Sequence, residues 1–399
     1  MAIVAVTDGE ERSALAVTRS LGKAGHTVVV TSTSGRSLAG ASRYAARDEK
    51  LPSALEAGGA FFDALHGVLR RARADVLIPI SEATLRAVLP RGAELAPVRL
   101  PFPPDDAFAR ASDKGVVLTL ARALGISEPT VAVLSSKSDL RGRLWETEGF
   151  PLVLKPTRSV VESPVGARKT SVQYVESVPD LEGAVGATEE EDFPLLVQRR
   201  VEGPGEGVFL LMAGGVVAAA FGHRRIREKP PAGGVSVLAE SVRPDPSLVE
   251  RSAALLRALG WEGVAMVEYK RDRESGEPVL MEVNARFWGS LQLAIDSGID
   301  FPALLVEHAL GRPVGPQQPP RAGVQTRWTL GDFDHLLAVL SKSRKELGLP
   351  ESAPGRLAAT GRFLRGFFPP VRSEICRPGD RRPAARELRT WISSAMGHR

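Results

Sequence analysis

Four polar side chains lie near the ends of two neighbouring apolar segments of the sequence. Glu268 ends the first segment, and Glu282, Asn284 and Arg286 lie at the end of the second. A polar turn over 271–277 joins the two segments, which predicts a β-hairpin. Because side chains on a strand alternate between its two faces, Glu282, Asn284 and Arg286 should share one face. Carboxylate and amide oxygens suit Mg²⁺, which commonly binds nucleotide phosphates at the same time.

Two lysines upstream occupy positions from which an ammonium group could contact phosphate. Lys155 closes the apolar run 151–155, and a strand end can hold such a side chain rigidly. Lys114 falls in the first turn of a helix expected over 113–124, with Ser112 as its N-cap. The positive end of the helix dipole would assist in binding an anion there. Either lysine could instead extend into solvent from the protein surface.

The first hundred residues alternate between strand and helix patterns. Apolar and β-branched runs predict strands, and apolar residues at helical spacing predict helices. Strands are expected over 3–6, 27–31 and 75–80, and helices over 11–24 and 60–74. This alternation predicts a small parallel sheet flanked by helices. The first turn, 7–10, lacks the G-x-G-x-x-G pattern, so we assign no dinucleotide to it.

Strand and hairpin patterns prevail after the proline-rich run 101–104, which predicts a linker. Strands are expected over 151–155, 195–198, 208–212, 216–221, 263–269 and 278–283, and helices over 247–259, 301–310 and 332–340. The arginine-rich segment 223–231 is expected to be a cationic loop after a strand. Prolines after Gly311 predict a second linker, and the remaining tail shows little periodicity.

The overall composition is that of an ordinary folded protein. With 399 residues, 43% hydrophobic and 25% charged, the chain predicts two or three domains. Its most apolar stretch, 208–222, is too short to span a bilayer, so no membrane association is expected. A single cysteine, Cys376, and an N-terminus unlike a secretory signal favour the cytoplasm.

The net charge of +5 arises from the tail after Leu340, which is rich in arginine. Aromatic residues make up only 6% of the chain and are not interleaved with basic residues, so we expect no nucleic-acid binding. Because the polar residues described above end at Arg286, we expect the tail to be dispensable for nucleotide binding.

In this order, these motifs resemble the ATP-grasp superfamily, and within it the carbamoyl-phosphate-synthase-like group. The resemblance covers about 105–311, and more weakly the first domain, which is similar to a pre-ATP-grasp domain. It implies an α/β fold, α+β in the ATP-grasp part. The implied domains are a pre-ATP-grasp βαβ domain (1–104), a two-lobed ATP-grasp domain (105–312, lobes about 105–194 and 195–312) and a basic C-terminal extension (313–399).

The resemblance also implies roles for individual residues. Lys114 and Lys155 correspond to the two phosphate-binding lysines, and Glu206 falls near the ribose-binding carboxylate. Segment 196–203 resembles the hinge strand that holds adenine, which gives Gln198, Arg199 and Val201 as ATP-binding residues. Glu268, Glu282 and Asn284 correspond to ligands of Mg²⁺, or of Mn²⁺ in its place, and Arg286 to the arginine that steadies phosphate or the intermediate.

The cationic segment after residue 222 is placed by the resemblance near the phosphates and the substrate. His223 is therefore expected to contact the nucleotide, and Arg225 and Arg227 the substrate, together with Arg286. A cationic loop there would also steer anionic ligands toward the site.

Two departures from the family pattern bear on these roles. The loop 157–169, which resembles the flap over the triphosphate, has only one glycine, so its phosphate contacts could come from Arg158, Arg168 or Lys169. At the hinge, Gln198 replaces a commonly acidic residue, although its amide can still accept a hydrogen bond from the adenine amine.

The implied activity is that of an ATP-dependent carboxylate–amine, or carboxylate–thiol, ligase. Such an enzyme forms an acyl phosphate from a small carboxylate and then an amide, releasing ADP and phosphate, with Lys155 and Arg286 as catalytic residues. A bicarbonate-activating enzyme of the carboxylase or carbamoyl-phosphate type is an alternative, as is a non-catalytic ATP-binding regulatory protein. The expected partners are a small carboxylate and an amine, and relatives suggest a homodimer.

Overall fold

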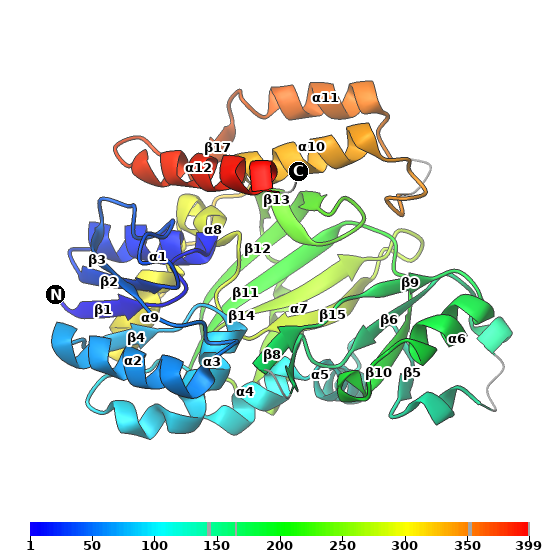
Figure 1. Cartoon of the computed structure of the whole chain (residues 1–399), viewed down its shortest axis with the longest axis horizontal. Coiled ribbons are helices and arrows are strands. Elements are labelled where there is room, and N and C mark those ends of the chain that lie inside the picture. The colour runs from blue at the N-terminus through cyan, green and yellow to red at the C-terminus, as the bar shows by residue number, and fades with distance from the viewer. Residues whose placement is uncertain (142–144, 164–165, 350–352, 398–399) are drawn as a thin grey trace.

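The N-terminal part of the computed structural model is a parallel α/β layer (Figure 1). The structure describes residues 1–399 except 142–144, 164–165, 350–352 and 398–399. The parallel strands occur in the order β3-β2-β1-β4: β1 (Ile3–Val6), β2 (Thr27–Ser32), β3 (Ala45–Lys50) and β4 (Val76–Ile78). The accompanying helices are α1 (Arg12–Lys23), α2 (Gly58–Ala72) and α3 (Glu82–Val88). The predicted βαβ unit is confirmed, but β3 was not expected, because its sequence is mostly charged and lies at the sheet edge.

A second, four-stranded sheet follows in the order β5-β10-β6-β9. Its strands are β5 (Thr130–Leu134), β6 (Leu152–Pro156), β9 (Gln173–Val175) and β10 (Leu195–Arg199), covered by α6 (Val178–Gly186), with the hairpin β7 (Val160–Ser163) and β8 (Gly166–Lys169) beside it. The helix expected over 113–124 is preceded by another, so that α4 (Asp105–Ser112) ends where α5 (Lys114–Ala123) begins. Asp113, rather than Ser112, caps α5, because its carboxylate accepts from two backbone N–H groups of the first turn.

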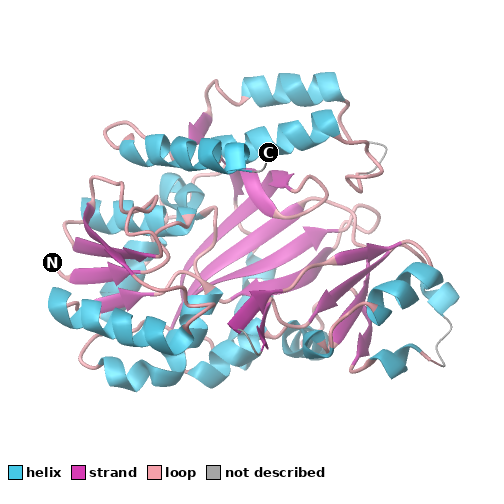
Figure 2. Cartoon of the chain, viewed as in Figure 1, coloured by secondary structure: helices cyan, strands magenta, loops and turns pink. Residues whose placement is uncertain are grey.

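The largest sheet has seven strands in the order β15-β14-β11-β12-β13-β16-β17, and Figure 2 shows it at the centre of the molecule. Its strands are β11 (Gly205–Ala213), β12 (Val216–Lys229), β13 (Val235–Val242), β14 (Gly263–Arg271), β15 (Pro278–Asn284), β16 (Gln325–Arg327) and β17 (Val371–Ser373). Helices α7 (Pro246–Ala258), α8 (Leu291–Ser297) and α9 (Phe301–Ala309) pack against it.

The cationic segment expected to be a loop is in fact strand. β12 continues through Lys229 and pairs with β13 along this stretch, from Gly222 opposite Val242 to Lys229 opposite Val235. Its arginines are tolerated in a sheet because acidic side chains neutralise them, as Glu268 does for Arg225. The loop prediction was therefore wrong at this position.

The basic tail is structured and joins the same sheet. Besides β16 and β17, it forms α10 (Thr329–Ser341), α11 (Arg356–Arg365) and α12 (Arg382–Gly397), which Figure 1 shows lying together above the end of β12 and β13. The tail is also fastened to α1, where buried Arg19 donates to Asp380 at 2.7 Å and to three backbone carbonyls. Within the described residues, no helix is long and apolar enough to cross a membrane.

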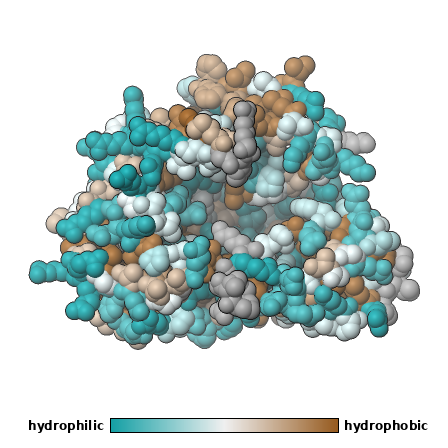
Figure 3. Space-filling model, in the orientation of Figure 1, coloured by the Kyte–Doolittle hydropathy of each residue, from teal (hydrophilic) through white to brown (hydrophobic). Residues whose placement is uncertain are grey.

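The outward face of α11 carries large apolar side chains in contact with solvent. Leu357 is 90% exposed, and Phe367 and Phe368, just beyond the helix, are 59% and 66% exposed. Figure 3 shows hydrophobic residues gathered at the top of the molecule, where Figure 1 places α11.

Candidate active site

A cavity of about 570 Å³ lies between the seven-stranded sheet and the four-stranded sheet β5-β10-β6-β9. Most of the predicted site residues line it: Lys155, Gln198, Arg199, Val201, His223, Arg225, Glu268, Glu282, Asn284 and Arg286. Lys114 lines a smaller adjoining cavity, which shares Glu282, Asn284 and Arg286 with the first. Two predicted residues, Glu206 and Arg227, do not line either cavity.

The predicted metal ligands are brought together by the register of β14 and β15. Glu268 pairs with Glu282 across the two strands, and Asn284 follows on the same face. The amide nitrogen of Asn284 lies 3.1 Å from Oε1 of Glu282 and 3.5 Å from Oε2 of Glu268. Within the described ranges no cluster of three or more His, Cys, Asp or Glu could hold a metal. Two carboxylates and an amide nevertheless fit Mg²⁺ that is completed by waters and phosphate oxygens.

The two carboxylates differ in their electrostatic surroundings. Burial raises the pKa of Glu268, and the charge of Glu282 adds to this, while Arg225 opposes it. Burial alone would also raise the pKa of Glu282, but the ammonium groups of Lys114 and Lys155 lower it below its ordinary value. Glu282 is therefore the more firmly ionised of the two.

The two lysines lie on either side of Glu282. Lys155 is only 9% exposed, and burial lowers its pKa to about 8 although Glu282 acts in the opposite direction. Lys114, at the start of α5, donates to Oγ of Ser159 at 2.6 Å, and its Nζ is 4.0 Å from Oε2 of Glu282. The positive charges of Lys114 and Lys155 repel each other, and the negative charge of Glu282 offsets this repulsion. The negative charge of a bound triphosphate would offset it further.

The basic residues of the expected flap are already paired. Arg158 lies 3.4 Å from Asp113, and Arg168 lies 2.8 Å from Asp192. The side chain of Lys169 lies outside the part of the chain that the structure describes.

The cavity is also lined by the residues expected to hold the adenine base. Gln198 is buried and donates its amide N–H to Oγ1 of Thr130 at 3.2 Å, which leaves its carbonyl oxygen as an acceptor. Val201 is also buried there, whereas Arg199 is half exposed and pairs with Asp272 at 3.3 Å. Two apolar residues that sequence reasoning missed, Val153 and Met281, line the same cavity.

Glu206 and Arg227 do not occupy the positions that the sequence predicted. The carboxylate of Glu206 accepts two hydrogen bonds from Arg271, at 2.9 and 2.8 Å. The carboxylate of Glu206 points away from the cavity. Glu206 pairs with Tyr269, and the next residue of β11 pairs with Glu268, so the side chains of Glu206 and Glu268 lie on opposite faces of the sheet. Arg227 donates to both carboxylate oxygens of Asp332 in α10, at 2.6 and 2.7 Å, and faces a separate cavity.

Several buried polar atoms on the cavity wall have no partner among the described residues. They are Nε2 of His223, Nε of Arg225, Oγ of Ser236 and Nε1 of Trp288. Burial holds the pKa of His223 well below its usual value, with Arg225 adding to the effect, so its imidazole is neutral. Buried polar atoms are almost always hydrogen-bonded in native proteins. All four atoms belong to residues that line the cavity, and each atom is itself buried within the wall.

Arg12 of α1 also lines this cavity. One of its Nη atoms pairs with Glu374, the other lies 3.4 Å from the carbonyl of Ser236, and the guanidinium stacks 4.3 Å from the ring of Trp328. Neither Arg12 nor Ser236 carried a signal in the sequence, because each reaches the site only through the docking of distant segments.

Comparisons with known proteins support the ATP-grasp resemblance. Residues 191–331 match the model of a family described as ATP-grasp in the biosynthetic pathway with Ter operon. No curated protein matches the chain.

Solved structures with the same fold are enzymes. The L-amino acid ligase of Bacillus licheniformis is 19% identical, with 80% of this chain and 78% of that chain covered and a TM-score of 0.62. N5-carboxyaminoimidazole ribonucleotide synthetase of Thermotoga maritima is 17% identical (80% and 78% covered, TM-score 0.57). The biotin carboxylase domain dimer of Hydrogenobacter thermophilus 2-oxoglutarate carboxylase, in complex with MgADP and bicarbonate, is 15% identical (81% and 73% covered, TM-score 0.59).

The chain therefore has the ATP-grasp fold, the fold of ATP-dependent ligases and carboxylases. The predicted α/β fold class and the ATP-grasp resemblance are both confirmed.

Proposed function

We propose that the protein is an ATP-dependent ligase that joins a small carboxylate to an amine or a thiol. The observation that carries this proposal is the meeting of Lys114, Lys155, two carboxylates, Asn284 and Arg286 around two adjoining cavities that share Glu282, Asn284 and Arg286. Phosphoryl transfer needs chiefly positioning and neutralisation of charge, and this set of side chains supplies both.

The nucleotide would lie along the cavity with its base at Gln198 and Val201 and its phosphates at the lysines. Gln198 offers a carbonyl acceptor for the amine of adenine, and Lys155 and Lys114, which line the two adjoining cavities, would contact the phosphate oxygens. Glu268, Glu282 and Asn284 would hold Mg²⁺, or Mn²⁺, and that cation would neutralise phosphate charge when bound.

The acid substrate would lie at the end of the cavity near Arg286, Arg12 and the unpartnered polar atoms. Nη2 of Arg286 is 3.5 Å from Oδ1 of Asn284, so its charge lies directly beside the proposed phosphate site. There Arg286 can orient a carboxylate for attack on the γ-phosphorus and stabilise the oxyanion that forms when the amine adds to the acyl phosphate.

A bicarbonate-activating enzyme is the second candidate, because one structural neighbour with this fold binds MgADP and bicarbonate. That neighbour is a dimer, and a homodimer is also our expectation for this chain.

The test is a screen of carboxylates for stimulated ADP release, with hydroxylamine as a general acceptor. The proposal expects that a carboxylate gives ADP together with a hydroxamate, because an acyl phosphate reacts with any small nucleophile. Release of AMP would contradict the mechanism, and stimulation by bicarbonate alone would favour the second candidate.

A further inference from the structure

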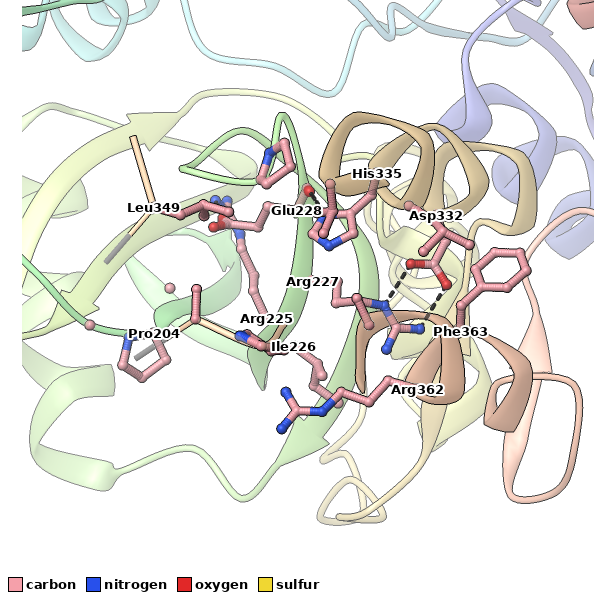
Figure 4. A pocket seen from close by; sticks show the side chains of 18 of the residues that line it. Pro204, Arg225, Ile226, Arg227, Glu228, Asp332, His335, Leu349, Arg362 and Phe363 are labelled. Atoms are coloured by element: carbon pink, nitrogen blue, oxygen red, sulfur yellow. Dashed lines mark hydrogen bonds and ion pairs between the residues drawn. The ribbon is translucent and has the colours of Figure 1, made fainter. Parts of the chain in front are cut away.

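A second cavity of about 370 Å³ lies beside the main one, between β12 and the helices of the tail. Its size falls within the range of about 300–1,000 Å³ that is usual for small-molecule sites. Figure 4 shows its wall, to which β12 contributes Arg225, Ile226, Arg227 and Glu228. Arg225 and Glu228 line both cavities, so the two are separated by little more than these side chains. The proposed ligase reaction assigns this cavity no role.

The wall formed by the tail is mainly apolar. Leu336 and Val339 of α10 are buried and line the cavity, as do Ala359 and Phe363 of α11 and Ile226 of β12. Such a lining favours a ligand with an apolar body.

Positive charge exceeds negative charge at one side of this cavity. Asp332 accepts from Arg227 at 2.6 Å and also from buried Arg327 at 2.5 Å, so one carboxylate serves two guanidinium groups. Arg362, which lines the cavity from α11, has no hydrogen-bond or ion-pair partner in the described part of the chain (Figure 4). An anionic group on a ligand would balance this excess.

A histidine offers a further polar contact. Nδ1 of His335 lies 2.6 Å from the backbone carbonyl of Glu228, and a carbonyl can only accept, so Nδ1 carries the proton. The other ring nitrogen of His335 is left for a ligand in the cavity that it lines.

We propose that this second cavity binds a small organic anion with an apolar body, such as a medium-chain or aryl-substituted carboxylate. The site is distinct from that for the nucleotide, and it is built chiefly by α10 and α11 of the tail together with β12. Its existence does not depend on the proposed ligase activity.

The experiment is calorimetric titration of the full-length protein with octanoate and 4-phenylbutanoate, without nucleotide. We expect at least one of these anions to bind with a stoichiometry of one, and octylammonium to bind at least tenfold more weakly because its charge is opposite. If neither anion binds, or if octylammonium binds equally well, the proposal is overturned.

Two variants locate the binding. Ala359→Trp should fill the cavity and abolish binding, and Arg362→Gln should weaken it by about tenfold through loss of a charge-assisted hydrogen bond. The matched controls lie on the same helix but outside the cavity: Arg365→Gln removes a similar charge, and Leu364→Ser removes an exposed apolar side chain. Both controls should bind as the wild type does.

The pattern across variants decides the outcome. Unchanged binding by Ala359→Trp and Arg362→Gln, or loss of binding in Leu364→Ser, would show that the probes adhere to the exposed face of α11 instead. Circular dichroism checks that each variant folds, and Val339→Phe provides a second way to reduce the cavity should Ala359→Trp not fold.

Discussion

Nη2 of Arg225 lies 2.5 Å from Oε2 of Glu268, within the set of residues proposed to hold the metal ion. Both side chains are nearly buried, with exposed fractions of 11% and 14%. Arg225 also donates to Glu228 at 2.9 Å, so it is shared between two carboxylates. The sequence had predicted that Arg225 contacts the substrate, but in this conformation it is not free to do so. Its contacts make it a residue that positions Glu268.

We expect that Arg225→Met lowers the free energy of unfolding by about 3 kcal/mol, because it leaves a buried carboxylate without its partner. Arg225→Met combined with Glu268→Gln should lose less than the two single variants added together. Arg224→Met is the control, since this neighbour is half exposed and its nearest carboxylate is 3.6 Å away. Its effect should stay below about 1 kcal/mol. Urea denaturation of the wild type and the four variants measures these losses, and equal losses for Arg224→Met and Arg225→Met would contradict the assignment.

Lys155 is expected to reduce the stability of the free protein. Its pKa is lowered by burial from 10.5 to about 8, so the folded state disfavours its charge. This cost is fully present below pH 8, where Lys155 is protonated in both states, and it disappears as the pH rises toward 10.5. Lys155→Met should therefore raise the free energy of unfolding at pH 7, by up to roughly 3 kcal/mol, and the gain should shrink between pH 8 and 10.

The same variant should lose the stabilisation by Mg·ATP. A ligand that binds only the folded protein raises its melting temperature, so wild type should show a shift that Lys155→Met lacks. Lys137→Met serves as a control, because this exposed lysine lies away from both cavities. An equal shift for wild type and Lys155→Met would remove this lysine from the phosphate site.

The predicted site residues that the structure brings together on one hairpin share a local cause. Glu268, Glu282 and Asn284 lie on one hairpin, where alternation and a short turn determine which side chains share a face. Their convergence could therefore be predicted without knowledge of the rest of the fold.

The errors concern features that distant segments determine. β16 and β17 have three residues each, which is too few for a detectable sequence pattern. They form because β16 pairs with the edge of β13, and β17 then pairs with β16. Arg12 reaches the cavity through the packing of the first sheet on the tail, and no spacing in the sequence records that contact.

The contacts of the tail with α1 predict that changes in the tail lower the stability of the protein. We had expected the chain after Leu340 to be dispensable for nucleotide binding, but it contributes to the fold, because buried Arg19 depends on Asp380 and on carbonyls of the tail. Asp380→Ala should cost about 3–5 kcal/mol in unfolding free energy, because it leaves a buried guanidinium without its carboxylate. Glu346→Ala, in an exposed turn of the tail, should cost little. Similar melting temperatures for wild type and Asp380→Ala would show that the contact contributes nothing to stability.

Substitutions of a charged and of an uncharged proposed metal ligand should have different effects on turnover. Glu282→Gln removes a carboxylate from between two lysines, so it should abolish turnover at any Mg²⁺ concentration, whereas Asn284→Ala should recover partly in excess Mg²⁺ because an amide contributes less to binding. Mn²⁺ binding, followed by electron paramagnetic resonance in the presence of ADP, gives the affinities directly. If both variants bind Mn²⁺ as wild type does, the ion must be held elsewhere.

Arg286 should separate chemistry from nucleotide binding. Its guanidinium is assigned to the acyl group and to the charge that develops on it, and not to the resting nucleotide, so Arg286→Ala should leave the Kd of Mg·ATP within about threefold of wild type. Hydroxamate formation should fall by about 10²–10³-fold, which is the usual cost of losing one donor to a developing oxyanion. Gln198→Ala provides the opposite case, because it should weaken Mg·ATP and leave the rate at saturating nucleotide nearly unchanged. Should Arg286→Ala weaken Mg·ATP as strongly as it slows hydroxamate formation, its charge would serve the phosphates of ATP, and the acid would have to be bound by other residues that line the cavity, such as Arg12.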